Sequence, residues 1–585
     1  MKLSDYVIDF LVSSGVTHIF EVAGGSLAHL LDSLYGRKDI LTVSMHHEQA
    51  AAMAAEGYAR TKGGIGVAMA TSGPGATNLI TGIGSCFFDS IPALFITGQV
   101  NTYEFKFNKP VRQMGFQETD IVNIVRPIVK DAMLVNEPEQ IKYCLERCLY
   151  LAMTGRPGPV LLDIPLNVQR ADIDPSTLKP FSEDSTGVLN TKLDEVVEQV
   201  LELINSSVRP IVLVGGGVRL AKCCDNLFEF IHKTGIPVVA SLMGLDAFPH
   251  EDPAFVGMIG TYGNRYANLA IANSDLVLAL GTRFDTRQTG TRPDTFARGA
   301  RIVHVDIDPW ELNNKIRTDL SVNCDLKKFL VSMNNNIGKD NYEKLESWKK
   351  IIKHYKEKYP SYNIPAGDAI DPNFFMHILS RYLPENAVVC TDIGQNQMWA
   401  AQSLEIKQHQ RFLTEGGMAA MGSAMPMAIG ASFAKPTSNM VVITGDGGFQ
   451  LNIQDLQTIF HHQLPIKIVL INNSCYGMVR QFQKQYFGSR FQSTVVGYSA
   501  PDFQSVVAAY KIPVYKARKK EDIEKALRLL FADRTPSFLE VVVDQNAEAL
   551  PKLPVGKPIE EQEPPLSREE LKSVMVIDPL EDNEE

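Results

Sequence analysis

Short apolar runs rich in valine and isoleucine recur along the whole chain, and this rhythm constrains the fold more than any other feature. The runs lie at residues 65–71, 93–97, 160–164, 211–214, 277–280, 302–305, 388–391, 441–444, 468–471 and 538–543. Helical stretches separate them, and a strand that is buried on both faces has such a continuous apolar sequence. The pattern predicts an α/β protein with doubly wound parallel sheets that helices cover on both faces.

The length of 585 residues is enough for three to five domains, at roughly 100–200 residues each. The strand rhythm lapses at residues 172–186, which are rich in Asp and Ser, and at residues 334–372, where a charged helix precedes a crossover with Pro and Gly. We therefore expect domains at 1–180, 188–340 and 365–550. An acidic tail at 551–585 has little to bury, and we expect a strap or a partly disordered segment.

The net charge of −10 argues against nucleic acid as a partner, because a phosphate backbone is bound by basic surfaces. No uncharged apolar run approaches the roughly 18 residues that a membrane helix needs, so no membrane partner is expected. The eight cysteines form neither a CxxC pair nor a regular framework. We expect reduced thiols, a cytoplasmic protein and no zinc site.

The most informative segment is Gly445-Asp446-Gly447-Gly448, which follows one apolar run directly, and Asn473 follows the next run 27 residues later. In parallel sheets both side chains reach the same edge, where ligands bind. Carboxylate and amide oxygens suit Mg²⁺, and glycines let the backbone approach a diphosphate. A lone Gly-Asp-Gly is also a common turn, but the pair is much more specific.

With this pair the chain resembles the thiamine diphosphate enzymes, whose diphosphate-binding motif combines Gly-Asp-Gly with Asn-Asn. The resemblance implies Asp446 and Asn473 as Mg²⁺ ligands, with the main-chain carbonyl of Cys475 as the third. It also implies that Glu48, in the segment 44–60, is the acid that activates the cofactor. On the sequence alone, Glu48 is simply a favourable acid at a helix start.

Further motifs resemble the acetolactate synthase (acetohydroxyacid synthase) family over residues 1–550. They lie at 21–26, 71–79, 89–92, 96–100, 116–119, 155–160, 283–290, 305–308, 394–402 and 416–422. The resemblance implies pyrimidine-binding, central FAD-type and diphosphate-binding domains. It also implies a homodimer or homotetramer with its active site at the subunit interface, and transfer of a two-carbon unit from pyruvate to a carbonyl acceptor, a second 2-keto acid in the first instance.

The resemblance also implies roles for individual residues. Gly25 and Gln117 are expected near the reacting centre, Arg287 on the carboxylate of the acceptor, and Met421 as an apolar wedge that bends the cofactor. The structural alternatives to these functional roles are a surface ion pair for Arg287 and ordinary core packing for Met421. The remaining residues expected at thiamine diphosphate are Gly73, Pro74, Asn78, Gly394, Gln395, Asn396, Gly417, Gly445, Gly447, Gly448 and Met478. Those expected at a mainly structural FAD are Arg156, Gly215, Gly216, Leu242, Met243, Gly257, Gly281, Arg283, Asp285, Asp306 and Asp325.

The chain departs from the family at three places. Phe482 stands where a Trp is expected, Asn396 stands where many members have His, and the connection at residues 101–115 is several residues longer. That connection is either a tolerated insertion or a contact surface for a larger, polar acceptor, through Tyr103, Lys106, Lys109 and Arg112. Such an insertion resembles the sugar-branching (YerE-type) branch of acetolactate-synthase-like enzymes, which implies a nucleotide-linked keto sugar as acceptor. A pyruvate oxidase and a non-catalytic scaffold subunit are weaker alternatives.

Overall fold

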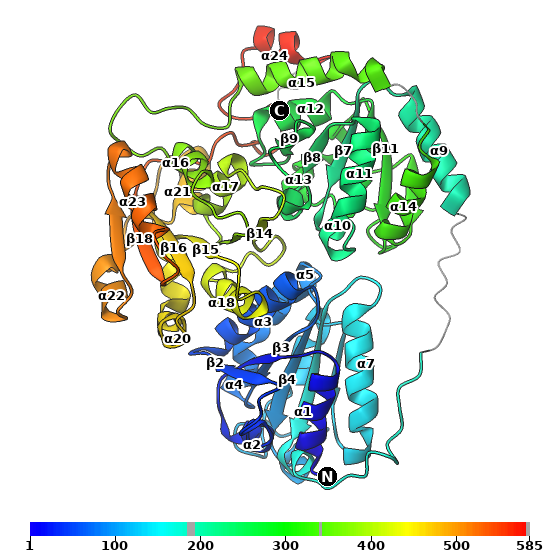
Figure 1. Cartoon of the computed structure of the whole chain (residues 1–585), viewed down its shortest axis with the longest axis vertical. Helices are drawn as coiled ribbons and strands as arrows, with labels where there is room; N and C mark the ends of the chain where they lie inside the picture. The colour runs from blue at the N-terminus through cyan, green and yellow to red at the C-terminus, as the bar shows by residue number, and fades with distance from the viewer. Residues whose placement is uncertain (184–192, 339–341, 581–585) are drawn as a thin grey trace.

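The computed structural model describes residues 1–183, 193–338 and 342–580, which form three blocks (Figure 1). Each block contains one six-stranded sheet, and every strand pair within the three sheets is parallel. Helices cover both faces of the sheets. The predicted α/β class with doubly wound parallel sheets is therefore confirmed.

The N-terminal block has the strand order β2-β1-β3-β4-β6-β5. In this order the strands are Leu41–Ser44, His18–Glu21, Gly66–Ala70, Ala93–Gln99, Pro159–Pro165 and Asp131–Leu134. Its helices are α1 (Leu3–Ser13), α2 (Ala28–Leu34), α3 (Glu48–Lys62), α4 (Pro74–Asn78), α5 (Ile80–Phe88), α6 (Ile121–Val125), α7 (Ile141–Met153) and α8 (Leu166–Gln169).

The central block has the order β12-β11-β10-β7-β8-β9. In this order the strands are Leu320–Asn323, Arg301–Asp306, Leu276–Leu280, Pro210–Val214, Val238–Ala240 and Phe255–Met258. Its helices are α9 (Leu193–Ser206), α10 (Gly216–Leu220), α11 (Cys224–Thr234), α12 (Arg265–Ala272), α13 (Thr286–Thr289), α14 (Leu326–Asn336) and α15 (Glu346–Lys358).

The C-terminal block has the order β14-β13-β15-β16-β18-β17. In this order the strands are Arg411–Leu413, Val388–Thr391, Met440–Gly445, Ile466–Asn472, Ser537–Val542 and Val514–Ala517. Its helices are α16 (Pro372–Ser380), α17 (Gln395–Ser403), α18 (Ala424–Ala434), α19 (Asp446–Phe449), α20 (Leu456–His461), α21 (Gly477–Tyr486), α22 (Phe503–Ala509) and α23 (Ile523–Leu530).

Helices α3 and α18 join the N-terminal block to the C-terminal block, backbone against backbone. A Cβ atom on Gly430 would lie 1.8 Å from the carbonyl oxygen of Ala54, and one on Gly57 would lie 2.0 Å from that of Met427. Real Cβ atoms do not approach so closely, so glycine at these positions permits the contact. The start of α3 and the helices of the C-terminal block are thereby held in one arrangement.

The segment after Leu550 crosses from the C-terminal block to the central block, where its helix α24 (Arg568–Val574) lies beside α15 (Figure 1, red). Ile559 and Val574 are buried in the same apolar cluster as Trp348 of α15. The expectation that the tail has little to bury is therefore wrong for Ile559, Leu571 and Val574, which are buried, although Val555 and Val576 stay exposed. The tail crosses the two blocks as a strap, which was the other expectation. Residues 581–585, and part of the expected boundary at 184–192, lie outside the described residues.

Candidate active site

Glu48 is the first residue of α3, at the carboxyl edge of the N-terminal sheet. His47 caps the helix, since its ring nitrogen Nδ1 accepts a hydrogen bond from the backbone N–H of Gln49 at 3.1 Å. The Glu48 carboxylate accepts a hydrogen bond from the side-chain amide of Asn78, at the end of α4, at 2.9 Å. The structure thus brings two of the expected site residues together and leaves Glu48 partly exposed.

Gly25, Gly73 and Gln117 come from neighbouring loops at the same edge. Ser26, beside Gly25, shares a hydrogen bond of 2.8 Å with Thr71, which leads into the turn at Gly73 and Pro74. Gly73 has φ +67°, and a Cβ atom there would lie 3.1 Å from Gln117. These expected residues therefore border one surface beside Glu48.

Asp446, Asn473 and Cys475 meet at the carboxyl edge of the C-terminal sheet, in the arrangement that the spacing predicted. The Asn473 amide nitrogen donates to Gln395 Oε1 at 3.0 Å. Its oxygen then lies 3.2 Å from Asp446 Oδ1 and 2.9 Å from the Cys475 carbonyl oxygen. Three oxygens face one another without a hydrogen between them, which is unfavourable unless a cation lies there or the amide is reversed.

Asp446 is 2% exposed, and burial raises the pKa of its carboxyl to about 6. The backbone amides of Gly447 and Cys475 and the hydroxyl of Tyr498, at 2.7 Å, donate hydrogen bonds to it and favour its ionised form. A cation beside the carboxylate would favour that form further. Among the described residues no group of three or more His, Cys, Asp and Glu side chains could hold a metal, so the candidate site depends on Asn473 and a main-chain carbonyl.

The glycines around Asp446 let other chain segments approach its turn. A Cβ atom on Gly445 would lie 3.1 Å from Asn396 Oδ1, one on Gly447 2.4 Å from the Tyr476 ring, and one on Gly448 2.7 Å from Asp392 Oδ2. Gly394, with φ +148°, leads into α17, whose residues Gln395 and Asn396 are buried here. Met478, at the start of α21, is half-buried beside the same turn.

Gly417 and Met421 lie on the loop between β14 and α18. The backbone N–H of Gly417 donates to Asp89 Oδ1 in the N-terminal block at 2.8 Å, so the loop bridges the two blocks. Met421 is half-buried. In the described chain no hydrogen bond or ion pair joins Glu48 or Asn78 to Asp446, Asn473 or Cys475, although the backbone N–H of nearby His46 donates to Asp455 of the C-terminal block at 3.0 Å.

A cavity of about 780 Å³ opens between the N-terminal and central blocks at the carboxyl edge of the central sheet. Its lining includes eight of the residues expected at FAD: Arg156, Gly216, Met243, Gly281, Arg283, Asp285, Asp306 and Asp325. Gly215 supports this wall, because a Cβ atom there would meet the Gly281 carbonyl oxygen at 2.1 Å. Burial raises the pKa of Asp306 to about 6.

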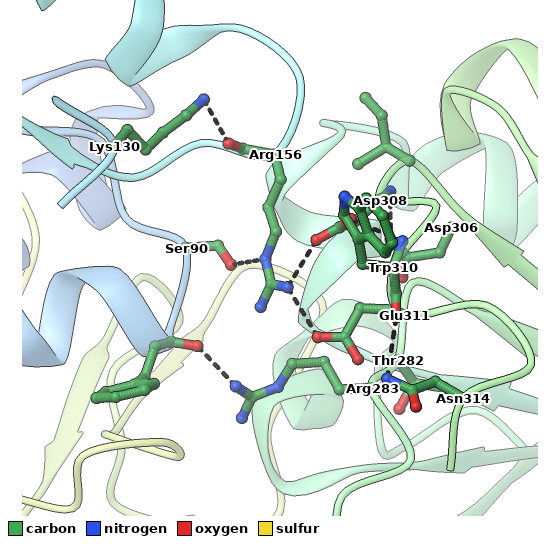
Figure 2. A network of polar contacts seen from close by, with 12 residues as sticks. Ser90, Lys130, Arg156, Thr282, Arg283, Asp306, Asp308, Trp310, Glu311 and Asn314 are labelled. Carbon is green, nitrogen blue, oxygen red and sulfur yellow. Dashed lines mark hydrogen bonds and ion pairs between the residues drawn. The ribbon is translucent and has the colours of Figure 1, made fainter. Parts of the chain in front are cut away.

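Arg156 ties the two walls of this cavity together (Figure 2). Its guanidinium donates to Ser90 at 2.8 Å in the N-terminal block, and to Asp308 at 3.0 Å and Glu311 at 2.8 Å in the central block. Arg283 donates to the Phe88 carbonyl oxygen at 2.8 Å alongside. The cavity is therefore shaped by charged contacts between the blocks.

Three expected residues lie elsewhere. Leu242 and Arg287 line a neighbouring small cavity of about 40 Å³, together with Met398 and Gly416. Gly257 lines neither cavity and packs against α12, where a Cβ atom on it would lie 2.6 Å from the Tyr266 ring. Arg287 is exposed, and within the described residues it forms no ion pair.

Two residues of the site were missed from the sequence. Asp392 follows β13 and accepts hydrogen bonds from the Gly422 backbone N–H and the Thr444 hydroxyl, at 2.8 and 2.9 Å. An acid directly after a buried strand is the pattern that identified Asp446, so it was detectable. Tyr498 lies 52 residues from its partner Asp446 in an irregular segment, and no sequence pattern marks it.

Comparisons with known proteins cover most of the chain. Three models of thiamine pyrophosphate enzymes match: the N-terminal TPP binding domain at residues 1–124, the central domain at 197–333 and the C-terminal TPP binding domain at 392–541. A chloroplastic acetolactate synthase 1 of Nicotiana tabacum is 37% identical over 569 residues, 95% of this chain and 84% of the relative. The acetolactate synthase large subunit of Pyropia yezoensis is 35% identical over 561 residues, 94% of this chain and 93% of the relative.

In the described part of the chain no helix is long and apolar enough to cross a membrane.

Proposed function

The chain belongs to the acetolactate synthase family of thiamine pyrophosphate (thiamine diphosphate) enzymes, and on this premise we propose that Glu48, Asp446 and Asn473 are the centre of its active site. As a member of this family it is a thiamine diphosphate-dependent carboligase that transfers a two-carbon unit. The observation that carries the assignment of residues is the meeting of three oxygens at Asp446, Asn473 and Cys475. Such a set of hard oxygens suits Mg²⁺.

When bound, thiamine diphosphate would supply the thiazolium ring that takes up the electron pair as CO₂ leaves pyruvate. Asp446, Asn473 and the Cys475 carbonyl would hold the Mg²⁺ that anchors its diphosphate. The glycines of the 445–448 turn leave the backbone open to the phosphates. Glu48, held by Asn78, would hold the pyrimidine ring and keep a proton at the carboxyl oxygen that faces it.

The variant Glu48→Gln tests this assignment, because glutamine can still accept the hydrogen bond from Asn78 but cannot exchange a proton. Pyruvate consumption should fall by about 10²–10⁴-fold. Binding of thiamine diphosphate, measured by equilibrium dialysis, should remain within a few-fold of wild type. Unchanged turnover would remove Glu48 from the mechanism.

A second pyruvate is the acceptor that we propose first, with acetolactate as product. Support comes from Arg287, an exposed cation without an acidic partner in the described chain, beside the small cavity lined by Met398 and Gly416. A free guanidinium is suited to bind a carboxylate through two parallel hydrogen bonds. The names of the relatives agree with this acceptor.

A nucleotide-linked keto sugar is a second candidate, favoured by the long connection at 101–115. The buried Glu118 carboxylate accepts hydrogen bonds from the backbone amides of Lys106, Met114 and Gly115 at 2.7, 2.6 and 3.2 Å. These contacts give the insertion a defined shape beside Gln117. Lys109 and Arg112 are exposed on it without an acidic partner in the described chain, as an anionic acceptor would require.

Product analysis separates the two acceptors. The enzyme should form acetolactate rapidly from pyruvate alone if the first proposal holds, and addition of a nucleotide-linked keto sugar should then give no new product. A branched sugar formed at the expense of acetolactate would favour the second. The double variant Lys109→Ala/Arg112→Ala would then raise the KM for the sugar, while pyruvate decarboxylation is retained.

FAD is the group that we propose for the cavity of about 780 Å³ at the carboxyl edge of the central sheet. Strand ends with Gly216 and Gly281 suit a dinucleotide, and the position is the usual one in open α/β sheets. We assign this FAD a structural role. Anaerobic bleaching of a copurified flavin by pyruvate at the rate of turnover would instead indicate an oxidase.

We propose a homo-oligomer in which the Glu48 group of one chain faces the Asp446 group of another. Support comes from the absence of a bond between the two groups within the described chain, and from exposed apolar side chains beside each. Phe116 is 87% exposed next to Gln117, and Val479 and Phe482 are 53% and 44% exposed on α21.

A cytoplasmic location is part of the proposal, supported by eight free cysteines, all within the described residues.

A further inference from the structure

A second large cavity lies in the central block, at the opposite end of its sheet from the proposed FAD site. It has a volume of about 710 Å³. Its lining comes from the end of α11, the residues that precede β8 and β9, and helix α15. Figure 1 shows α15 across the end of the central block that is farthest from the N-terminal block. The cavity is therefore separate from every residue assigned above to the reaction.

The floor of this cavity is apolar. Ile231, Pro237, Phe255, Val256 and Ile352 line it, and all but Pro237 are buried hydrophobic side chains of the core. A volume of this size and an apolar lining are typical of small-molecule sites, which bury most of an apolar ligand. The floor accordingly suits an alkyl chain or a small ring.

One wall carries the cations. Lys349, Lys353 and Lys356 are spaced at i, i+4 and i+7 on α15, so they share one face of the helix. The Lys349 ammonium extends over Gly235, where a Cβ atom would lie 3.0 Å from its nitrogen. The nearest acidic partners are exposed: Glu346 at 3.1 Å from Lys349 and Glu357 at 3.8 Å from Lys353. Such exposed pairs are weak. Glu357 also lines the cavity and Lys356 donates to the Phe255 carbonyl oxygen at 3.0 Å, but the three lysines still outnumber the acid on this wall.

The opposite wall carries one acid, Asp252, beside His232. His232 Nε2 lies 3.2 Å from Asp252 Oδ2, and His232 Nδ1 bonds the Phe228 carbonyl oxygen at 2.9 Å. The two walls therefore differ, because the lysines lie on the α15 side only and the opposite wall carries Asp252.

From the apolar floor and the lysine wall we infer that this cavity binds a small amphipathic anion, an apolar chain or ring with one carboxylate or phosphate end. The apolar part lies on the floor between α11 and β9, and the anionic end lies against Lys349 and Lys353. The site is distinct from the proposed active site and does not depend on its assignment.

Calorimetric titration of the full-length protein with octanoate, 1-octanol and octylamine at constant ionic strength tests the inference. These probes share one chain and differ in charge. Octanoate should bind one molecule per chain, about tenfold more tightly than octanol, and octylamine should bind least. Equal affinity for the three probes would overturn the charge argument.

Variants test whether octanoate binds in this cavity. Lys349→Gln/Lys353→Gln should weaken octanoate about tenfold and leave octanol unchanged, whereas Lys350→Gln, on the same helix but outside the lining, should change neither. Ala254→Trp, which fills the cavity, should abolish binding of both, with circular dichroism as the check on folding. Octanoate binding should also persist in Arg287→Ala. Loss of binding there, with full binding in the lysine variant, would place the ligand at the reaction site and contradict the inference.

Discussion

Asn473 is held by a single donor contact, and this contact decides what its oxygen can bind. Its amide nitrogen donates to Gln395, whose own nitrogen donates to the Ala547 carbonyl oxygen at 3.0 Å. With the Gln395 oxygen as acceptor, the Asn473 oxygen faces Asp446 and the Cys475 carbonyl, whereas the reversed amide would donate to both of these oxygens. The orientation that a cation requires is therefore supported by neighbours on α17.

Asp446→Asn tests the cation site at this scale. The new amide nitrogen can donate to the oxygens of Asn473 or Cys475, which fills the place of the cation. We expect the affinity for Mg²⁺, measured by titration in the presence of thiamine diphosphate, to fall by about 10–100-fold. The matched change Asp502→Asn, at the exposed N-terminus of α22, should leave it unchanged, since asparagine caps helices equally well. Equal Mg²⁺ affinity in both variants would contradict the assignment.

A second prediction concerns Asp163 and the pH dependence of the protein's folding stability. It is fully buried, accepts hydrogen bonds from Thr97 and Gln99, and burial raises the pKa of its carboxyl from 3.8 to about 7. The folded state therefore binds a proton that the unfolded state has lost between pH 4 and pH 7. Stability from this group is present below pH 4 and is lost as the pH rises to about 7.

Asp163→Asn removes this titration and can keep both hydrogen bonds, because its amide can donate to the Thr97 hydroxyl and accept from Gln99. Relative to wild type, the variant should gain thermal stability as the pH rises from 5 to 8, by roughly 3 kcal/mol at most. Melting curves across this range measure the difference. A constant difference in melting temperature between the two proteins would show that Asp163 stays ionised throughout.

At the scale of elements, the strands that the sequence predicted are those in the interior of the sheets. The apolar runs correspond to β3, β4, β6, β7, β10, β11, β13, β15, β16 and β18. Every edge strand was missed, together with β1 and β8. Edge strands such as β2, with one buried residue in four, are exposed on one side and so lack a continuous apolar run.

The same reasoning explains which site residues were predictable. Asp446 and Asn473 follow interior strands that pair directly, β15 with β16, so their meeting follows from the topology. The contact between α3 and α18 joins residues more than 350 positions apart and depends on glycines that no local pattern distinguishes. Tertiary packing of this kind is visible only in the structure.

Gly430→Ala tests the contact between the two helices. Its methyl group would meet the Ala54 carbonyl oxygen and force α3 and α18 apart, at a cost of about 1–3 kcal/mol or more. We expect a lower melting temperature and a raised KM for thiamine diphosphate. Gly64→Ala, where a Cβ atom has open space, is the matched control and should melt as wild type. If both variants melt alike, the helices tolerate separation and the contact does not fix the site.

At the scale of the whole molecule, contacts between blocks hold the parts of the site in place. Arg156 joins the N-terminal and central blocks across the FAD cavity, the Gly417 loop joins the N-terminal and C-terminal blocks, and the tail after Leu550 joins the C-terminal and central blocks. Three sheets were predictable from the rhythm of apolar runs, but the arrangement of the blocks was not, because these contacts join residues far apart in the sequence that no local pattern marks. The domain limits at 180, 188, 340 and 365 stay predictions.

The central claim is that Glu48 of one chain and Asp446 of another act in one active site, and mixed oligomers test it most directly. Glu48→Gln and Asp446→Asn chains, each inactive alone, are coexpressed with different tags, and oligomers that carry both tags are isolated. A dimer of the two variants contains one site with both residues intact, so pyruvate turnover should recover to roughly half of the wild-type value per dimer. Mixed oligomers as inactive as either parent would show that the two residues act within one chain, and would contradict the account.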